Sequence, residues 1–142
     1  CRTMSSSMSR SERDWVAQGA SEADVLSRLY DVWTYKEALT KNMGLGLGYD
    51  FARIDLRFGR DVRLAMDGRA VDTYRFRELA LPCGASSHAP GSRVAVALGP
   101  CDAREAPMAK QAVPAQQAMD EGWLRMWTYD AWLEYARAMS GV

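Results

Sequence analysis

The chain has 142 residues, of which 48% are hydrophobic and 25% charged, as is typical of one globular domain and not of a disordered chain. Its 18 basic and 18 acidic residues leave no net charge, so no overall field favours nucleic acid or an anionic membrane. No apolar run approaches the ~20 residues of a transmembrane segment. We expect a soluble, cytoplasmic protein with a flexible Ser-rich arm over residues 1–10 and a single α+β domain over residues 11–142. The alternative location is a membrane surface, with a lipid anchor on Cys1.

Two helices are predicted before residue 45. Ser11 and Ser21 each precede an acidic residue by three positions, which is the spacing of a helix N-cap. We therefore expect a short helix that is closed by Gly19 and a longer one that ends at Met43. The longer segment has apolar residues every three or four positions, the pattern of an amphipathic helix with one face in a core. These residues are Val25, Leu26, Leu29, Val32, Trp33, Leu39 and Met43.

Alternating apolar and polar residues predict antiparallel strands from residue 51 onward. The alternation covers residues 54–58 and 62–66, and Asp67–Gly68 is a signal for a two-residue hairpin turn. In the returning strand the parity shifts near Asp72, which indicates a bulge. A last strand carries Val94, Val96 and Leu98.

From Pro107 to the end the sequence is helical again, with Pro114 suited to a first turn and Gly122 as a weak point. The predicted fold is therefore α+β. It consists of N-terminal helices, an antiparallel meander of three or four strands, and a long C-terminal helix packed on the sheet.

This C-terminal helix is unusually aromatic. Its polar stripe is narrow and consists of Asp130, Glu134 and Arg137, so more than one of its faces must be covered. Burial between the sheet and the N-terminal helix is one explanation. Aromatic side chains are also enriched at the centres of protein interfaces. We predict a partner-binding surface made of Trp123, Trp127, Tyr129, Trp132 and Tyr135.

The polar side of the predicted strands is rich in arginine. Cross-strand ion pairs on a solvated face would explain this pattern, and anion binding is the functional alternative. Single-strand nucleic-acid binders interleave basic residues with exposed aromatic residues. Here Phe58, Tyr74 and Phe76 share the apolar side instead, so nucleic acid is not an expected partner. The candidate anion-binding residues are Arg53, Arg57, Arg63, Arg75 and Arg77.

Cysteine and histidine residues offer little chemistry. Cys83 and Cys101 flank a segment rich in Gly, Ser and Pro and would close a loop as a disulfide, whereas free thiols are usual in the cytoplasm. His88 is the only histidine, and with Cys83 and Asp102 it lacks the local signature of a nucleophile. A zinc site built from these residues would need a fourth ligand. We predict no catalytic residue, no metal and no cofactor.

These features favour a non-enzymatic protein-interaction or assembly protein. It would associate through the aromatic helix, either with itself as a homo-oligomer or with another protein. A bacterial or phage origin, as a virion component or an inhibitor of a host system, fits the small size. The first alternative is a small-molecule-binding module or small enzyme with an aromatic-walled pocket. The second is an anion- or nucleic-acid-binding protein that uses the arginine face.

The tripeptide Trp-Thr-Tyr occurs twice, at residues 33–35 and 127–129. In the second segment the positions three, seven and ten after the Trp form the whole polar face of the helix. In the first segment the same positions border the apolar stripe, so the two copies cannot pack equivalently. We expect the functional surface on the second copy.

Overall fold

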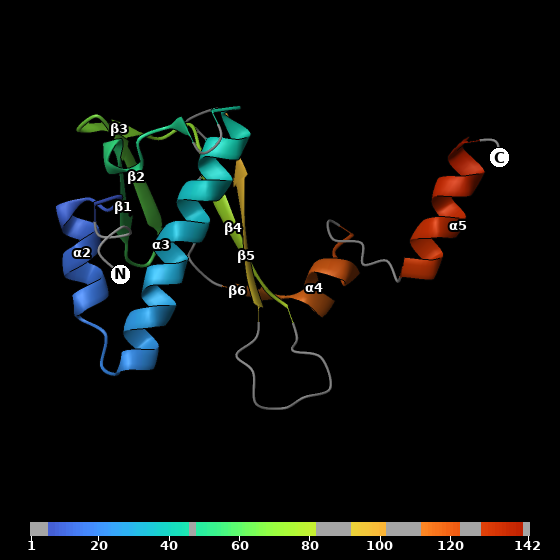
Figure 1. The fold of residues 1–142 in the computed structure, drawn as a ribbon, viewed down its shortest axis with the longest axis horizontal. Coiled ribbons are helices and arrows are strands. Elements are labelled where there is room, and N and C mark those ends of the chain that lie inside the picture. The colour runs from blue at the N-terminus through green and yellow to red at the C-terminus, as the bar shows by residue number, and fades with distance from the viewer. Residues whose placement is uncertain (1–5, 46–47, 82–91, 102–111, 123–128, 141–142) are drawn as a thin grey trace.

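The computed structural model describes residues 6–45, 48–81, 92–101, 112–122 and 129–140. These residues combine α-helices with largely antiparallel strands, which confirms the predicted α+β class (Figure 1). None of the described helices combines the length and apolarity that crossing a membrane requires. The boundary between an arm and a single domain at residue 10 stays a prediction.

Helix α2 (Arg10–Ala17) begins two residues earlier than predicted. Its N-cap is Ser9, whose hydroxyl accepts a hydrogen bond from the Glu12 amide at 3.2 Å. The Glu12 carboxylate accepts one from the Ser9 amide at 2.7 Å and completes a capping box. Such a box favours Glu or Gln at the third position. The third residue after Ser9 is Glu12, whereas the third residue after Ser11 is Asp14. The helix is therefore capped by Ser9 and not by Ser11.

Helix α3 (Glu22–Asn42) lies where the sequence predicts it. Ser21 is the N-cap and accepts from the Asp24 amide at 3.2 Å. At the other end Met43 is the C-cap. Gly44 follows with a φ of 71°, in the left-handed region where glycine commonly ends a helix. Capping signals and apolar periodicity therefore predict both ends of α3.

The first sheet is a three-stranded meander of β1 (Ile54–Phe58), β2 (Val62–Met66) and β3 (Arg69–Val71), preceded by the short helix η2 (Phe51–Arg53). Both pairs of neighbouring strands are antiparallel. The Asp67–Gly68 turn has φ values of 51° and 76°, which are typical of a two-residue hairpin. This part of the predicted meander is confirmed.

A second sheet replaces the predicted bulge and fourth strand. It has the order β5-β4-β6, formed by β4 (Arg75–Leu81), β5 (Ser92–Leu98) and β6 (Ala112–Pro114). Strand β5 is antiparallel to β4, and β6 is parallel to it. The parity shift near Asp72 thus marks the place where the chain leaves one sheet and enters another. A single meander was the wrong prediction.

Strand β5 also faces the core with the side opposite to the predicted one. Ala97 belongs to the buried core and Ala95 packs against it, whereas Leu98 is 40% exposed. Because alanine side chains are small, they let α3 pack closely on β5. Hydrophobicity alone predicts that the larger side chains of Val94, Val96 and Leu98 face the core.

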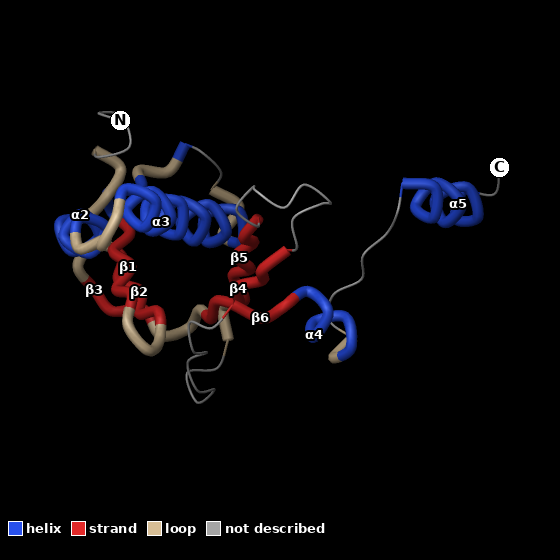
Figure 2. The backbone as a smooth tube through the Cα atoms, turned by 90° about the horizontal axis from the view of Figure 1, so that it is seen from below, coloured by secondary structure: helices blue, strands red, loops and turns tan. Residues whose placement is uncertain are grey.

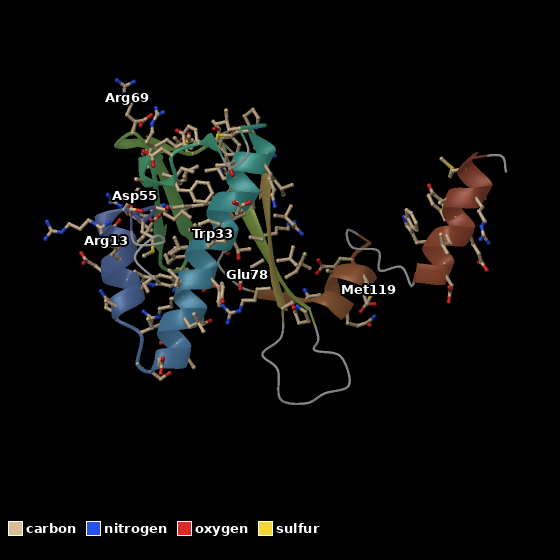
Figure 3. The ribbon with its side chains drawn as sticks, viewed as in Figure 1. Arg13, Trp33, Asp55, Arg69, Glu78 and Met119 are labelled. Carbon is tan, nitrogen blue, oxygen red and sulfur yellow. The ribbon has the colours of Figure 1, made fainter. Side chains whose placement is uncertain are left out.

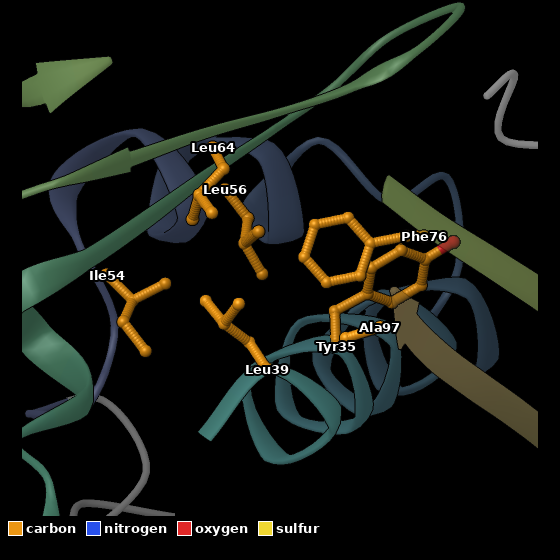
Figure 4. Packing of buried hydrophobic residues seen from close by; sticks show 7 residues of the cluster. All are labelled: Tyr35, Leu39, Ile54, Leu56, Leu64, Phe76 and Ala97. Carbon is orange, nitrogen blue, oxygen red and sulfur yellow. The ribbon is translucent and has the colours of Figure 1, made fainter. Parts of the chain in front are cut away.

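One hydrophobic core connects α3 with both sheets. Figure 4 shows Leu39 of α3 directed toward the aliphatic side chains of β1 and β2. The rings of Tyr35 and Phe76 pack together, with centroids 5.1 Å apart. Helix α3 is therefore the element that joins the two sheets. The core residues are Tyr35, Leu39, Ile54, Leu56, Leu64, Phe76 and Ala97.

The C-terminal part differs from the predicted long helix. Helix α4 (Ala115–Asp120) begins after its N-cap Pro114, and Gly122 with a φ of 78° follows its end. Helix α5 (Tyr129–Ser140) is a separate element. Both Figures 1 and 2 show α5 apart from the two sheets. One long helix packed on the sheet is therefore not confirmed, and the left-handed Gly122 follows the end of α4 as a helix terminator does.

Candidate functional site

A buried lysine in α3 ties three separate segments together. Lys36 Nζ lies 2.7 Å from Glu12 Oε2 and donates to the carbonyl oxygens of Ser7 at 2.9 Å and Phe51 at 2.7 Å. The Lys36 side chain is 1% exposed. Burial lowers the pKa of Lys36, and the hydrogen bond and charge of Glu12 oppose this effect. Since an ammonium group has three donors, Lys36 has none left for a ligand.

Glu12 extends this tie to the first sheet. Its Oε1 accepts a hydrogen bond from the Leu56 amide at 2.8 Å. Strand β1 is an edge strand, and edge strands leave backbone groups unpaired. Glu12 therefore satisfies a backbone donor of β1 while it neutralises Lys36.

Glu37, the residue after Lys36, has one carboxylate oxygen that meets no partner in the described part of the chain. Glu37 Oε2 lies 3.4 Å from the Lys41 Nζ, one helical turn further on. Glu37 Oε1 is buried and has no hydrogen-bond partner among the described residues. The Lys41 side chain is 73% exposed, so this end of the pair is open to a ligand. A buried polar atom without a partner is costly, and a cation or donor from a ligand would relieve that cost.

A carboxylate of this kind suits a hard divalent cation. Mg²⁺ prefers oxygen ligands and is often held by one or two carboxylates together with substrate phosphates. Glu37 Oε1 meets this requirement as a single ligand. No group of three or more His, Cys, Asp or Glu residues that could hold a metal occurs within the described ranges. The described residues therefore offer one cation ligand and a neighbouring ammonium group.

A small apolar hollow lies beside this part of α3. Trp33, one helical turn before Glu37, packs against Phe51 with ring centroids 5.2 Å apart. Figure 3 shows Trp33 near the middle of α3. Because the Lys36 donors are already occupied, the hollow offers mainly apolar contacts. Its lining consists of Ser7, Met8, Leu29, Val32, Trp33, Lys36 and Phe51.

The predicted partner-binding residues belong to the C-terminal part of the chain. Trp132 is 52% and Tyr135 48% exposed on α5, and Met139 beside them is 73% exposed. Trp123 and Trp127 lie outside the described residues, and Tyr129 is the first residue of α5. A partner role for this surface stays a prediction.

The five arginines do not share one exposed sheet face. Arg53, Arg57 and Arg63 belong to the first sheet region, whereas Arg75 and Arg77 belong to β4 in the second sheet. Arg53 forms a bidentate ion pair with Asp67, in which both N–O distances are 2.7 Å. The Arg57 Nε lies 3.2 Å from Asp55 Oδ2. Arg75 is buried and donates to backbone carbonyls, including that of Tyr74 at 3.1 Å. The five arginines therefore do not lie on one sheet face, because the chain changes sheets after β3, and anion binding by them stays a prediction.

The remaining predicted residues are mostly outside the described ranges. Cys1, Cys83, His88 and Asp102 are among them. Cys101 is a half-buried free thiol, and its predicted disulfide partner is Cys83. Lipidation of Cys1 and a role for His88 therefore stay untested.

Sequence reasoning missed Lys36, Glu37 and Lys41 as a group. One signal was available, because Lys36 follows Val32 by four positions and precedes Leu39 by three. It therefore lies next to the apolar stripe, where a lysine is almost never fully buried without a partner. The partner Glu12 could not be identified from the spacing, since it comes from another helix.

Comparisons with known proteins give a family for this region. The family model described as "ACPS: 4'-phosphopantetheinyl transferase superfamily" matches residues 2–97. A protein of Paxillus involutus described as "4'-phosphopantetheinyl transferase pptA" is 40% identical over 67 residues. That alignment covers 47% of this chain and 25% of the fungal protein, so the chain matches about a quarter of the relative's length. No solved structure matches the chain.

These matches overturn the prediction of a non-enzymatic interaction or assembly protein, because both descriptions name a transferase. The matches also favour the first Trp-Thr-Tyr segment over the second as part of the functional region. Residues 33–35 lie inside the matched range of 2–97, whereas residues 127–129 lie outside it. The expectation that the second copy carries the function rested on its excess of aromatic surface.

Proposed function

Because the chain belongs to the 4′-phosphopantetheinyl transferase superfamily, we propose that it acts in the transfer of a 4′-phosphopantetheinyl group. The donor we propose is coenzyme A, and the acceptor is a hydroxyl group on a protein. The observation that supports a location for this chemistry is the buried Oε1 of Glu37, which has no hydrogen-bond partner among the residues that the structure describes. Glu37 lies within the matched residues 2–97.

The proposed reaction is a phosphoryl-type transfer. The acceptor hydroxyl oxygen forms a bond to the phosphorus of the transferred group, and the bond from that phosphorus to the bridging oxygen of the donor breaks. The hydroxyl proton leaves to a base or to solvent, and the leaving group carries the bridging oxygen. Negative charge spreads over the phosphoryl oxygens, so a protein accelerates the step mainly by positioning and by electrostatic stabilisation.

Three of the described residues would have different roles in this step. Glu37 Oε1 would hold a divalent cation, which supplies positive charge to the phosphate oxygens when it is bound. The exposed ammonium of Lys41, which pairs with Glu37 at 3.4 Å, would contact a phosphate oxygen of the donor. Lys36 would hold the adjacent backbone in place through its three buried contacts.

The donor, the acceptor and the partners of the whole protein are our proposals, since the chain matches about a quarter of the fungal relative. The acceptor would be the protein partner. A cytoplasmic location and a homo-oligomeric state are predictions from the sequence alone.

Glu37→Gln tests the proposal, because it removes the charge and keeps the size of the side chain. We expect the affinity for Mn²⁺, measured by electron paramagnetic resonance, to fall roughly tenfold or more. Transfer of a fluorescent label from labelled coenzyme A to an apo acyl carrier protein should fall with it.

The matched control is Glu22→Gln. Glu22 is an exposed glutamate in the first turn of the same helix, and its loss should leave Mn²⁺ affinity unchanged. Equal Mn²⁺ affinity in the Glu37→Gln variant and the unaltered protein would contradict the assignment of this site.

A further inference from the structure

A polar network connects α3 to the second sheet. Its two carboxylates are buried, whereas the Arg93 side chain that pairs with them is 47% exposed. Arg93 of β5 places its Nη1 2.8 Å from Asp31 Oδ1 and 3.7 Å from Glu78 Oε1. The Tyr35 hydroxyl donates to Glu78 Oε2 at 3.1 Å. The Asp31 and Glu78 side chains are 6% and 5% exposed, and Figure 3 shows Glu78 close to α3. We call Asp31, Tyr35, Glu78 and Arg93 the polar anchor.

The protonation states of the polar anchor suit this arrangement. Burial raises the pKa of Tyr35, and the nearby Glu78 carboxylate raises it further, so the hydroxyl remains a donor. Burial lowers the pKa of Arg93, but hydrogen bonding and charge from Asp31, with the charge of Glu78, outweigh it. The guanidinium therefore stays charged between two carboxylates. Removing Arg93 would take this cation away from the buried carboxylates of Asp31 and Glu78.

The polar anchor and Lys36 hold opposite flanks of α3. Successive residues of an α-helix are rotated by about 100°. Lys36 therefore lies about 100° from Glu37 on one flank, and Asp31, six residues before Glu37, lies about 120° away on the other. Tyr35 lies nearly opposite Glu37. A rotation of α3 about its axis would break polar contacts on one flank or the other.

Apolar packing alone fixes such a rotation less well. Hydrophobic side chains of similar volume can repack with a modest loss of stability, whereas a buried charged group must keep its partner within hydrogen-bonding distance. Lys36 meets Glu12 at 2.7 Å, and Arg93 meets Asp31 at 2.8 Å. The two ion pairs together therefore define the direction in which Glu37 points.

We propose that Asp31, Tyr35, Glu78 and Arg93 are positioning residues that fix the rotation of α3 and thereby aim the Glu37 carboxylate at a divalent cation. This inference rests on the proposed function, because it requires Glu37 to hold the cation. None of the four residues needs to touch the cation or the donor.

The test measures Mn²⁺ affinity by electron paramagnetic resonance in variants of the full chain. Tyr35→Phe keeps the ring in the core and removes only the hydroxyl, and Arg93→Met removes the central charge. All samples are held at a temperature at which circular dichroism shows them to be folded. We expect Arg93→Met to weaken Mn²⁺ binding by about tenfold, as is usual when a group that orients a metal ligand is lost. Tyr35→Phe should weaken it less, and Arg93→Lys should restore most of the affinity.

Val71→Ala controls for a general loss of stability. Val71 packs against the core from β3 and does not belong to the polar anchor. The truncation should lower the melting temperature and leave Mn²⁺ affinity unchanged. If it weakens Mn²⁺ binding as much as Arg93→Met does for the same drop in melting temperature, the positioning role is wrong.

The outcomes also separate this inference from the proposed function. If Glu37→Gln weakens Mn²⁺ binding but Arg93→Met and Tyr35→Phe do not, the positioning role is overturned and the cation site stands. If the unaltered protein binds Mn²⁺ no more tightly than Glu37→Gln, the assignment of the cation site to Glu37 is overturned and this inference with it.

Discussion

At the residue scale, two adjacent charged residues of α3 have different roles. Lys36 uses all three of its donors inside the protein, on Glu12 and on two backbone carbonyls. Glu37 keeps a buried carboxylate oxygen without a partner among the described residues. The contacts of Lys36 stabilise the fold, and the remaining oxygen of Glu37 can accept a ligand.

Lys36→Met should therefore lower the free energy of unfolding by about 3–5 kcal/mol, because Glu12 would be left as an uncompensated buried charge. Urea unfolding followed by circular dichroism measures the change. Adding Glu12→Gln to Lys36→Met should recover part of the loss, since the charge is then gone. Arg10→Met is the control, because both side chains of its ion pair with Asp14 are exposed and such a pair contributes little to stability. Similar losses for Lys36→Met and Arg10→Met would show that Lys36 does not stabilise the fold through its buried contacts.

At the element scale, the first sheet depends on its hairpin turn. Gly68 has a φ of 76°, and a Cβ there would meet no atom within 4 Å. Gly68→Ala should therefore cost about 1 kcal/mol through backbone strain alone, measured as a lower stability in urea. Gly59→Ala is the matched control, since Gly59 lies outside the left-handed region and its nearest contact would be at 3.8 Å. A loss of the same size at Gly59 would mean that the turn conformation is not the cause.

Elements with local signals could be predicted, and those that depend on distant pairing could not. The Ser21 cap and the Gly44 end are next to the helix that they bound, so the sequence predicts α3 closely. Strand β6 forms only because Ala112 pairs with Glu78, far away in the chain. The burial of Lys36 likewise depends on Glu12 from another helix. The site was missed for this reason, because the burial of a lysine beside an apolar stripe cannot be predicted until its partner is known.

At the scale of the whole molecule, α3 links the fold to the proposed chemistry. One face of this helix contributes Tyr35 and Leu39 to the common core, and another carries Glu37 and Lys41. The sheets therefore support the candidate site indirectly, because they hold the helix and not the ligand. Loss of the polar contacts that hold α3 against either sheet should therefore reach the site through α3.

Leu39→Ala tests whether the two sheets have one core. Leu39 has no exposed surface, and its cluster joins Ile54 of the first sheet to Phe76 and Ala97 of the second. We expect a loss of about 2–5 kcal/mol. Amide hydrogen exchange should show protection falling by the same free energy in β1–β2 and in β4–β5, because one cooperative unit contains both. Leu45→Ala is the control, since Leu45 is 46% exposed and its truncation should change neither sheet. If only one sheet lost protection, each sheet would have its own core and α3 would not couple them.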